Sequence, residues 1–303
     1  MSISYVNGRY LPKKNAKISI EDRGFNFSDG VYELIKFSNL FLLNFEDHTQ
    51  RLENSLSSIE IVFPFSNKIS LKIIINNLIK LNNFESGYVY VQVTRGTAKR
   101  DHKFPLNVKS NVIISIFPEK DYKDLLKGIK VKIFPDLRWS RCDIKSISLL
   151  PNVLGKEKAH KLGVYEIWQK NINSEITEGT TSNSFIVNHN DEIQTHPKNN
   201  NILGGVTRNL VIALAKKNDL KVKEKPFNVK EAYNCKEAFL TSTTVGILPV
   251  LSIDEMRISS GKPGEITKLL IAIFLQLKTA QHNLGKWIID QKQCGMINLN
   301  LGL

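Results

Sequence analysis

Cysteine is scarce in this sequence, and its spacing does not predict a disulfide framework. The three cysteines, Cys142, Cys235 and Cys294, lie far apart, without a C-x-x-C pair or a His/Cys spacing typical of metal ligands. This scarcity excludes a small disulfide-stapled domain. We therefore expect a reduced, cytoplasmic chain that holds no metal.

Long apolar runs and targeting signals are also missing. The longest apolar segment, residues 269–275, is too short to span a bilayer, which needs about 20 residues. Residues 1–5 lack the charged stretch and apolar core of a signal peptide. We expect a soluble protein without a membrane partner.

Acidic residues are in the minority. The chain has 42 Lys and Arg against 29 Asp and Glu, a net charge of +13. The basic residues are dispersed, in no run longer than pairs such as Lys13-Lys14. Nucleic-acid sites cluster their cations, so this dispersal indicates a solvated basic surface and no nucleic-acid partner. Such a surface would still attract small anions.

The length and composition suit two domains. A chain of 303 residues with 42% hydrophobic residues can form two separate cores. Short predicted strands and helices alternate throughout, without an internal repeat or a low-complexity linker. We predict an α/β (α+β) fold with a small N-terminal α/β domain, residues 1–121, and a larger, barrel-like C-terminal α/β domain, residues 122–303.

Hydrophobic spacing places the elements of the first domain. Leu52, Leu56 and Ile59 recur at helical spacing, whereas residues 88–94 alternate as a strand does. Asn7-Gly8 between two apolar runs predicts a hairpin turn. The predicted strands are 3–7, 10–12, 31–37, 40–43, 88–94 and 112–117, and the predicted helices are 48–59 and 69–81.

The second domain shows the same alternation. Glu178 falls in a polar loop after a strand, and Thr207 is the predicted N-cap of the helix that follows Gly204-Gly205. A hairpin is expected around Asn190-Asp191. The predicted strands are 129–134, 166–169, 185–188, 192–195 and 237–242, and the predicted helices are 152–162, 207–217 and 229–233.

One lysine stands in a specific setting. Lys145 follows the segment Arg138-Trp139-Ser140-Arg141-Cys142-Asp143 and precedes the apolar segment 147–150. Burial favours the uncharged amine that forms a Schiff base, so Lys145 is a candidate for covalent chemistry. The alternative is one more solvated lysine among the 42 basic residues.

Three segments together resemble the pyridoxal-phosphate enzymes of fold type IV, the class IV aminotransferases. They are Arg141–Ser146, Leu149–Leu154 and Glu178-Gly179-Thr180-Thr181-Ser182-Asn183, within a resemblance that runs from Tyr5 to about Gly264. The resemblance implies a two-domain α/β fold, pyridoxal 5′-phosphate as the cofactor, and a homodimer. It also implies that Lys145 is the catalytic residue that bonds to the cofactor.

The same resemblance assigns the other cofactor contacts. Glu178 would pair with the pyridine nitrogen and keep it protonated, which makes the ring a stronger electron sink. Without the resemblance, Glu178 could be a turn residue and Thr207 an ordinary helix cap. The residues implied to bind the phosphate or to lie against the ring are Arg51, Leu203, Val206, Thr207, Ser242 and Thr243.

The loop Arg95-Gly96-Thr97-Ala98-Lys99-Arg100-Asp101-His102 resembles the R-G-T-x-x-R-x-H signature of D-amino acid aminotransferases. In that subfamily the second Arg and the His of this loop bind the substrate α-carboxylate together with a Tyr, which Tyr32 matches. The loop that carries the Arg and the His reaches into the active site of the partner subunit. An arginine can contact a carboxylate with two N–H groups. The resemblance therefore implies Tyr32, Arg100 and His102 as substrate-binding residues, and a solvated basic loop is the alternative.

The implied reaction moves the amino group of a D-amino acid, such as D-alanine, to a 2-oxo acid, such as 2-oxoglutarate. A branched-chain L-amino acid aminotransferase and an aminodeoxychorismate lyase share the fold but usually lack the paired Arg and His. A basic binding protein without catalysis is a further alternative. Lys99 and the long tail after Leu275 depart from the family pattern.

Overall fold

The computed structural model describes residues 2–293, which form two compact units. Both units mix helices and strands, as the predicted two-domain α/β fold requires. Cys142 and Cys235 are buried free thiols, and Cys294 lies outside the described residues. Of the described residues, the first unit contains 2–120, 144–148 and 279–293, and the second contains 121–143 and 149–278.

The segment 144–148 belongs to the first unit, whereas the predicted boundary at residue 121 placed it in the second domain. Backbone pairing explains the difference. Ser146 forms an isolated antiparallel bridge with Val31, and the amide of Ile147 donates to the carbonyl of Gly30 at 3.1 Å. The chain around Lys145 is therefore held against strand β3 (Gly30–Ser38).

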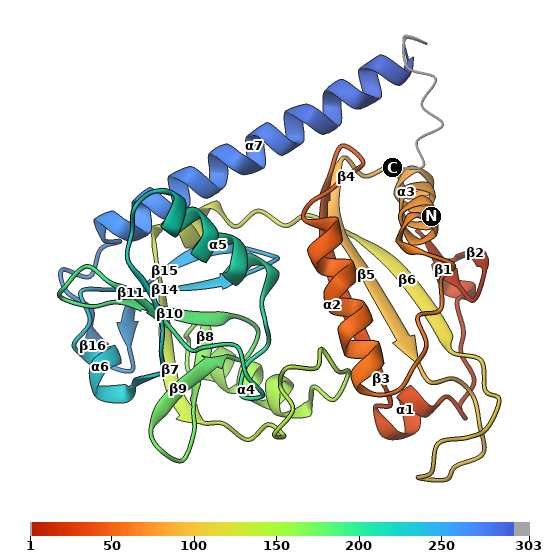
Figure 1. Ribbon diagram of the computed structural model, residues 1–303, viewed down its shortest axis with the longest axis horizontal. Coiled ribbons are helices and arrows are strands. Elements are labelled where there is room, and N and C mark those ends of the chain that lie inside the picture. Colours follow the sequence, from red (N-terminus) through yellow and green to blue (C-terminus); the bar gives the residue numbers. More distant parts are fainter. Residues whose placement is uncertain (1, 294–303) are drawn as a thin grey trace. The chain divides into compact units, whose positions relative to one another are not determined.

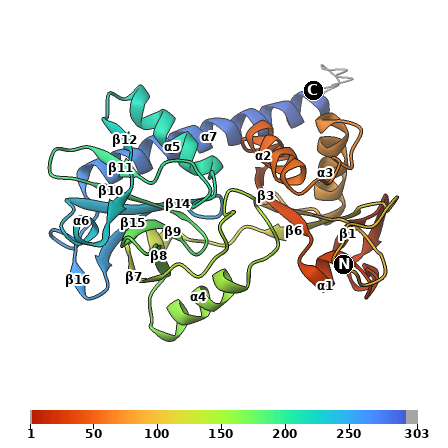
Figure 2. The same cartoon turned by 60° about the horizontal axis from the view of Figure 1, so that its bottom comes forward.

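The first unit is built on a six-stranded antiparallel sheet with the order β2-β1-β6-β5-β3-β4. Helices α2 and α3 cover the same face of this sheet (Figures 1 and 2). The predicted hairpin is confirmed, since β1 and β2 pair around Gly8, which has φ 92°. The elements are β1 (Ile3–Val6), β2 (Arg9–Pro12), α1 (Arg23–Phe27), β3 (Gly30–Ser38), β4 (Phe41–Leu42), α2 (Phe45–Ser58), α3 (Lys68–Asn82), β5 (Ser86–Thr94) and β6 (Asn111–Pro118).

Apolar residues at regular spacing join these helices to the sheet. The helical residues recur every three or four positions and meet every second residue of β5, which confirms the predicted patterns. Each fully buried Leu, Ile or Val contributes about 1.5–3 kcal/mol. The residues of this contact that are at most 1% exposed include Leu52, Leu56, Leu71, Ile75, Leu78, Val89, Val91 and Val93.

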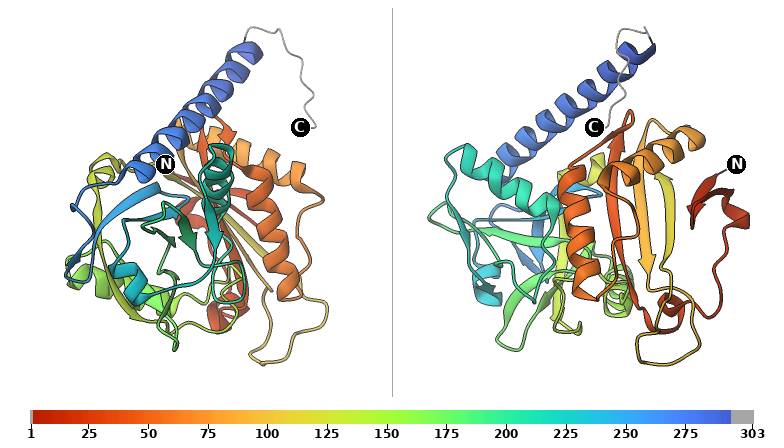
Figure 3. Two further views of the ribbon diagram at one scale, coloured as in Figure 1. Left: turned by 60° about the vertical axis from the view of Figure 1, so that its left-hand side comes forward. Right: turned by 45° about the vertical axis from the view of Figure 1, so that its right-hand side comes forward.

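The second unit contains a ten-stranded sheet that curls on itself (Figure 3). Its main order is β12-β11-β10-β14-β15-β7-β8-β9-β13, with β16 paired to β15. The short turn 180–182 joins β9 directly to β10, although four strands separate them in this order, so the sheet must curl. The strands are β7 (Ile129–Pro135), β8 (Glu166–Lys170), β9 (Glu175–Gly179), β10 (Asn183–Val187), β11 (Ile193–Thr195), β12 (Val222–Glu224), β13 (Phe227–Asn228), β14 (Glu237–Ser242), β15 (Gly246–Ile253) and β16 (Met256–Arg257).

The helices of the second unit are α4 (Leu150–Lys161), α5 (Val206–Lys217) and α6 (Val229–Tyr233), and α7 (Glu265–Gln293) begins in it, while residues 279–293 of α7 are assigned to the first unit. The first three match predicted helices, whereas α7 was not predicted. Strand β15 was also not predicted, and it contains Pro249, a residue that is rare in central strands. Pro249 is tolerated because the ladder to β7 begins only at Val250. Within residues 2–293, no helix combines the length and apolar character that a membrane span needs.

Candidate active site

Lys145 is held beside Tyr32 and Ser55 in the first unit. Its carbonyl accepts from the amide of Tyr32 at 3.0 Å, and its amide donates to Oγ of Ser55 at 3.2 Å. Its Nζ lies 4.1 Å from the centroid of the Tyr32 ring. The face of a tyrosine ring attracts an ammonium. The structure thus brings together two residues that the sequence predicted separately.

Arg51 is paired with a buried carboxylate that sequence analysis missed. Its Nε and Nη2 donate to the two carboxylate oxygens of Glu33 at 2.9 and 2.6 Å. Glu33 is 0% exposed, and its Oε1 also lies 3.0 Å from Nδ1 of His48. Glu33 lies on β3, while Arg51 and His48 lie on α2. The Arg51 guanidinium is therefore fixed by the protein itself.

Burial and neighbouring charge set the ionisation of this group. Burial alone would raise the pKa of Glu33, but Arg51 and His48 outweigh it and hold that pKa well below its usual range. Burial lowers the pKa of His48, Glu33 opposes this only in part, and the charges of Arg51 and Lys145 lower it further. The ionised form of Glu33 and the neutral form of His48 are therefore favoured.

Arg100 and His102 lie on an exposed loop and share one aromatic neighbour. The Arg100 guanidinium and the His102 ring lie 5.0 and 5.3 Å from the ring of Phe27 on α1. Arg23 of α1 fixes the loop by donating to the carbonyl of His102 at 3.4 Å and to the carbonyl of Asp101 at 2.5 Å. Among residues 2–293, no hydrogen bond or ring contact joins Arg100 or His102 to Tyr32. The described chain therefore does not assemble the three predicted substrate residues.

Glu178 lies in strand β9, not in a loop after a strand as predicted. It is buried, and three donors meet its carboxylate. Oε1 accepts from the amide of Leu203 at 3.0 Å and from Nη1 of Arg138, and Oε2 accepts from Nδ2 of Asn183 at 2.8 Å. Asn183 also donates to the carbonyl of Leu203 at 2.9 Å. Two predicted residues, Glu178 and Leu203, are thus in direct contact.

Burial and charge compete at Glu178. Burial raises the pKa of Glu178 to about 7, while the Arg138 guanidinium and the Leu203 amide limit the rise and Asp136 adds to it. Despite its burial, Arg138 stays cationic, because Glu178 and Asp136 raise its pKa. Sequence analysis noted Arg138 only as part of the segment before Lys145. Nothing in the sequence links it to a carboxylate 40 positions later.

The start of α5 lies against this cluster. The helix begins at Val206 with Gly205 as its N-cap, so the predicted N-cap role of Thr207 was wrong. Thr207 is instead in the first turn, whose N–H groups lack intrahelical acceptors and can bind an anion. A Cβ on Gly205 would lie 2.0 Å from Oδ1 of Asn183. This close approach places the first turn of α5 beside the group that binds Glu178.

Sheet pairing brings the turn after β14 to the same place. Thr241 faces Asn183 across the antiparallel pair β14 and β10. Its buried Oγ1 has no hydrogen-bond partner in the described part of the chain. Ser242 Oγ lies 3.0 Å from Oγ1 of Thr244, with Thr243 between them. Several hydroxyl groups therefore gather near the first turn of α5.

A second buried carboxylate shapes the turn between β9 and β10. Glu166 is 0% exposed and accepts from the hydroxyl groups of Thr180 at 2.5 Å, Thr181 at 2.8 Å and Ser182. It also accepts from the amide of Thr181 at 3.0 Å, and Nζ of Lys156 lies 3.6 Å away. These contacts fix the two strands that carry the Glu178 cluster.

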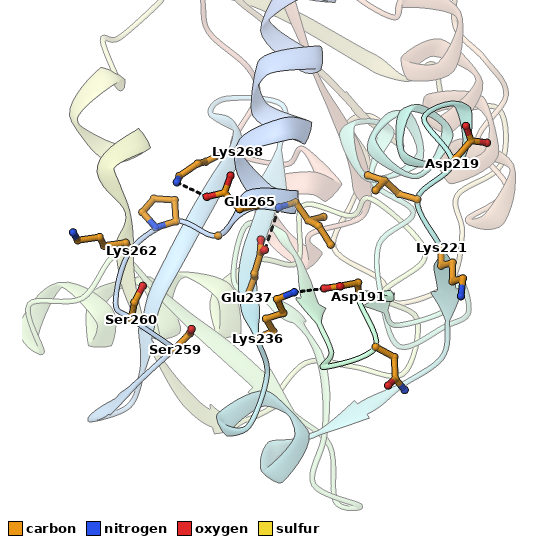
Figure 4. A pocket seen from close by; sticks show the side chains of 15 residues that line it. Asp191, Asp219, Lys221, Lys236, Glu237, Ser259, Ser260, Lys262, Glu265 and Lys268 are labelled. Atoms are coloured by element: carbon orange, nitrogen blue, oxygen red, sulfur yellow. Dashed lines mark hydrogen bonds and ion pairs between the residues drawn. The ribbon is translucent and has the colours of Figure 1, made fainter.

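A separate pocket of about 750 Å³ opens beside the start of α7 (Figure 4). Glu237 lines it and accepts from the amides of Ile266 at 3.1 Å and Thr267 at 2.8 Å. Lys236 pairs there with Asp191. The predicted site residues do not line this pocket, and its buried carboxylate already binds the helix start. The candidate site residues therefore form two separate groups, one around Lys145 and Arg51 in the first unit and one around Glu178 in the second.

Relatives with known names share this sequence over most of its length. Residues 30–253 match the family described as amino-transferase class IV. A D-alanine aminotransferase of Bacillus licheniformis is 40% identical over 263 residues, covering 86% of this chain and 92% of the relative. A D-alanine aminotransferase of Staphylococcus haemolyticus is 37% identical over 272 residues, covering 89% and 95%.

Solved structures show the same fold. A branched-chain amino acid aminotransferase from Escherichia coli has a TM-score of 0.83 and 25% identity, covering 91% of this chain and 94% of that one. A branched-chain aminotransferase from the archaeon Thermoproteus uzoniensis, solved with norvaline, has a TM-score of 0.83 and 22% identity, covering 92% and 95%. The predicted two-domain, fold type IV architecture is confirmed. This chain belongs to the class IV aminotransferases and is a pyridoxal-phosphate-dependent transaminase.

Proposed function

We propose that this enzyme transfers the amino group of a D-amino acid, with D-alanine as the first candidate, to a 2-oxo acid such as 2-oxoglutarate. Two lines support the D-amino acid substrate. The relatives named D-alanine aminotransferases are 40% and 37% identical, and the loop from Arg95 to His102 matches the signature of that subfamily. The observation that carries the transaminase chemistry is the buried Glu178 carboxylate beside the first turn of α5.

The second unit fits the ring and phosphate of the cofactor. Oε2 of Glu178 accepts one hydrogen bond from Asn183, so it has capacity for a second donor such as a ring N–H. The first-turn amides of α5 and nearby hydroxyl groups suit a phosphate. The residues that would hold the ring and phosphate in this unit are Glu178, Leu203, Val206, Thr207, Ser242 and Thr243.

The first unit would supply the reactive amine and a further cation. Bound pyridoxal phosphate supplies an aldehyde that condenses with amines and a ring that spreads the electron pair left on the substrate Cα. Lys145 Nζ would bond to the cofactor and, once released by the substrate amine, take the proton from Cα. Arg51, held by Glu33, would contribute its guanidinium to the phosphate.

Substrate orientation is assigned to Tyr32, Arg100 and His102. Arg100 and His102 lie on an exposed loop and contact Phe27, as a loop that serves a partner's active site would allow. We therefore infer a homodimer in which this loop binds the substrate α-carboxylate in the other subunit. From the scarcity of cysteine, we also infer a cytoplasmic location.

A branched-chain L-amino acid aminotransferase is the second candidate, because such enzymes are among the most similar solved structures. Spectrophotometric titration of the purified enzyme separates the two. D-alanine should change the cofactor absorbance and yield pyruvate, whereas L-leucine should do neither at the same concentration. Lys145→Ala enzyme serves as the control for turnover. A faster response to L-leucine would reject the D-amino acid assignment.

A further inference from the structure

Hydrogen bonds to residues other than Glu178 fix the orientation of the Arg138 side chain. Its Nε donates to Oδ1 of Asp136 at 2.9 Å and its Nη2 to Oδ2 at 2.7 Å, which fixes the plane of the guanidinium. Thr177 holds Asp136 in turn, with its hydroxyl 2.8 Å from Oδ2. Nη2 also donates to the carbonyl of Asn201 at 3.0 Å. The remaining nitrogen, Nη1, is thereby directed at Oε1 of Glu178.

These contacts give the two carboxylate oxygens of Glu178 different hydrogen-bond partners. Oε1 accepts from Arg138 and from the amide of Leu203. Oε2 accepts from Asn183 and can take one more donor. The contacts of the protein therefore orient the carboxylate so that Oε2 is the oxygen offered to a ligand.

The charges around Glu178 are arranged for one more cation. Charged and titratable groups that act on it include Arg138, Asp136 and Cys142, all on the segment after β7. Burial raises the pKa of Cys142 to about 12, so its thiol is uncharged. When both carboxyl groups are ionised, Asp136, Glu178 and Arg138 together carry one net negative charge in a buried site. A protonated ring nitrogen would balance that charge.

We propose that Arg138 is a positioning residue that keeps the Glu178 carboxylate oriented and ionised for the ring nitrogen of the cofactor. The inference rests on the role proposed for Glu178. Without the guanidinium, burial would favour the carboxylic acid, and the shared proton would move from the ring nitrogen to Glu178. A ring without that proton is a weaker electron sink, so the chemical step would slow while substrate binding would not change.

The test uses the holoenzyme with cofactor labelled with ¹⁵N at the ring nitrogen. In wild type the ¹⁵N chemical shift should be that of a protonated pyridine. Arg138→Met should move it toward the unprotonated value and lower kcat about tenfold or more, with KM unchanged. Arg138→Lys keeps the charge but loses the paired N–H groups of the guanidinium. It should therefore restore most of the wild-type ¹⁵N shift and only part of the wild-type kcat.

Arg141→Met is the matched control, because Arg141 pairs with Asp143 on the same segment but its side chain is 42% exposed. It should leave the ¹⁵N shift and kcat unchanged. An Arg138→Met enzyme with the wild-type ¹⁵N shift overturns the inference. If Arg138→Met does not fold, an Arg138→Lys enzyme with wild-type kcat overturns it instead.

Glu178→Gln separates this inference from the role of Glu178 itself. If the ring nitrogen stays protonated in Glu178→Gln, the proposed role of Glu178 fails, and the role of Arg138 fails with it. If Glu178→Gln removes the ring proton but Arg138→Met does not, only the role of Arg138 fails.

Discussion

Nζ of Lys145 lies 4.1 Å from the centroid of the Tyr32 ring, although the two residues are more than a hundred positions apart. Strand β3 creates this contact, because the amide of Tyr32 donates to the carbonyl of Lys145 at 3.0 Å. The reactive amine is thus placed by backbone pairing within the first unit.

Lys145→Ala should abolish the covalent link to the cofactor while the protein still folds. After borohydride reduction, mass spectrometry should detect a cofactor adduct on wild type and none on the variant, and turnover should fall by orders of magnitude. Lys158→Ala is the control, since Nζ of Lys158 also lies over an aromatic ring, that of Phe134, at 3.4 Å. An adduct that persists in Lys145→Ala would assign the link to another lysine.

Glu178→Gln should lower kcat about a hundredfold or more, with a smaller loss of cofactor affinity, because glutamine keeps the shape but not the charge. Steady-state kinetics and cofactor titration measure the two effects. Glu175→Gln, three positions earlier on β9, is the control and should behave like wild type. Unchanged kcat in Glu178→Gln would make Glu178 a purely structural residue.

Arg100→Ala should raise KM about ten- to a hundredfold for every D-amino acid, because all share the α-carboxylate and a charge-assisted hydrogen bond is lost. Arg100→Lys should recover only part, since an ammonium cannot contact both carboxylate oxygens as a fork does. The kinetics are measured with D-alanine, D-glutamate and L-leucine. Lys99→Ala on the same exposed loop is the control. Unaltered D-alanine kinetics in Arg100→Ala would remove this loop from substrate binding.

Glu33→Gln should destabilise the protein at neutral pH by about 3–5 kcal/mol, because it removes the buried carboxylate that pairs with the largely covered Arg51 guanidinium. Arg51 and His48 hold the pKa of Glu33 below its usual value of 4.5. Its stabilising effect is therefore present above that pH and is lost as the pH falls further.

Urea unfolding should thus show a difference in the free energy of unfolding between wild type and Glu33→Gln, and this gap should narrow toward acid pH. Glu46→Gln on α2 is the control, because the side chain of Glu46 is 75% exposed. A gap that stays constant, or widens, below pH 4.5 would contradict the assigned ionisation of Glu33.

Gly205→Ala should weaken cofactor binding, because the new Cβ would lie 2.0 Å from Oδ1 of Asn183 and displace that side chain from Glu178. Gly204→Ala should have little effect, since its Cβ would meet only the flexible end of Lys198 at 3.2 Å. Cofactor dissociation constants measure both, and we expect about a tenfold loss or more for Gly205→Ala alone. Equal effects of the two substitutions would show that Asn183 is free to move.

Local patterns were sufficient for much of the fold and for the candidate residues. Helices α2, α3 and α5 follow from apolar spacing, and the turn at Gly8 from Asn-Gly, because each depends on neighbours within a few positions. The motif around Lys145 indicated both the amine and the family. Strand β9 was missed, because the Glu-Ile-Thr-Glu-Gly sequence from Glu175 to Gly179 contains one large apolar residue.

The partners of the buried charges were decided only by the tertiary structure. The chain has 29 acidic residues, and sequence spacing does not say that Glu33 binds Arg51 or that Arg138 binds Glu178. Those pairs form because curled and antiparallel strands bring distant segments together, and a buried charge is stable only with a partner. The sequence by itself therefore determined which residue types are available for the chemistry, while folding determined which charges face them.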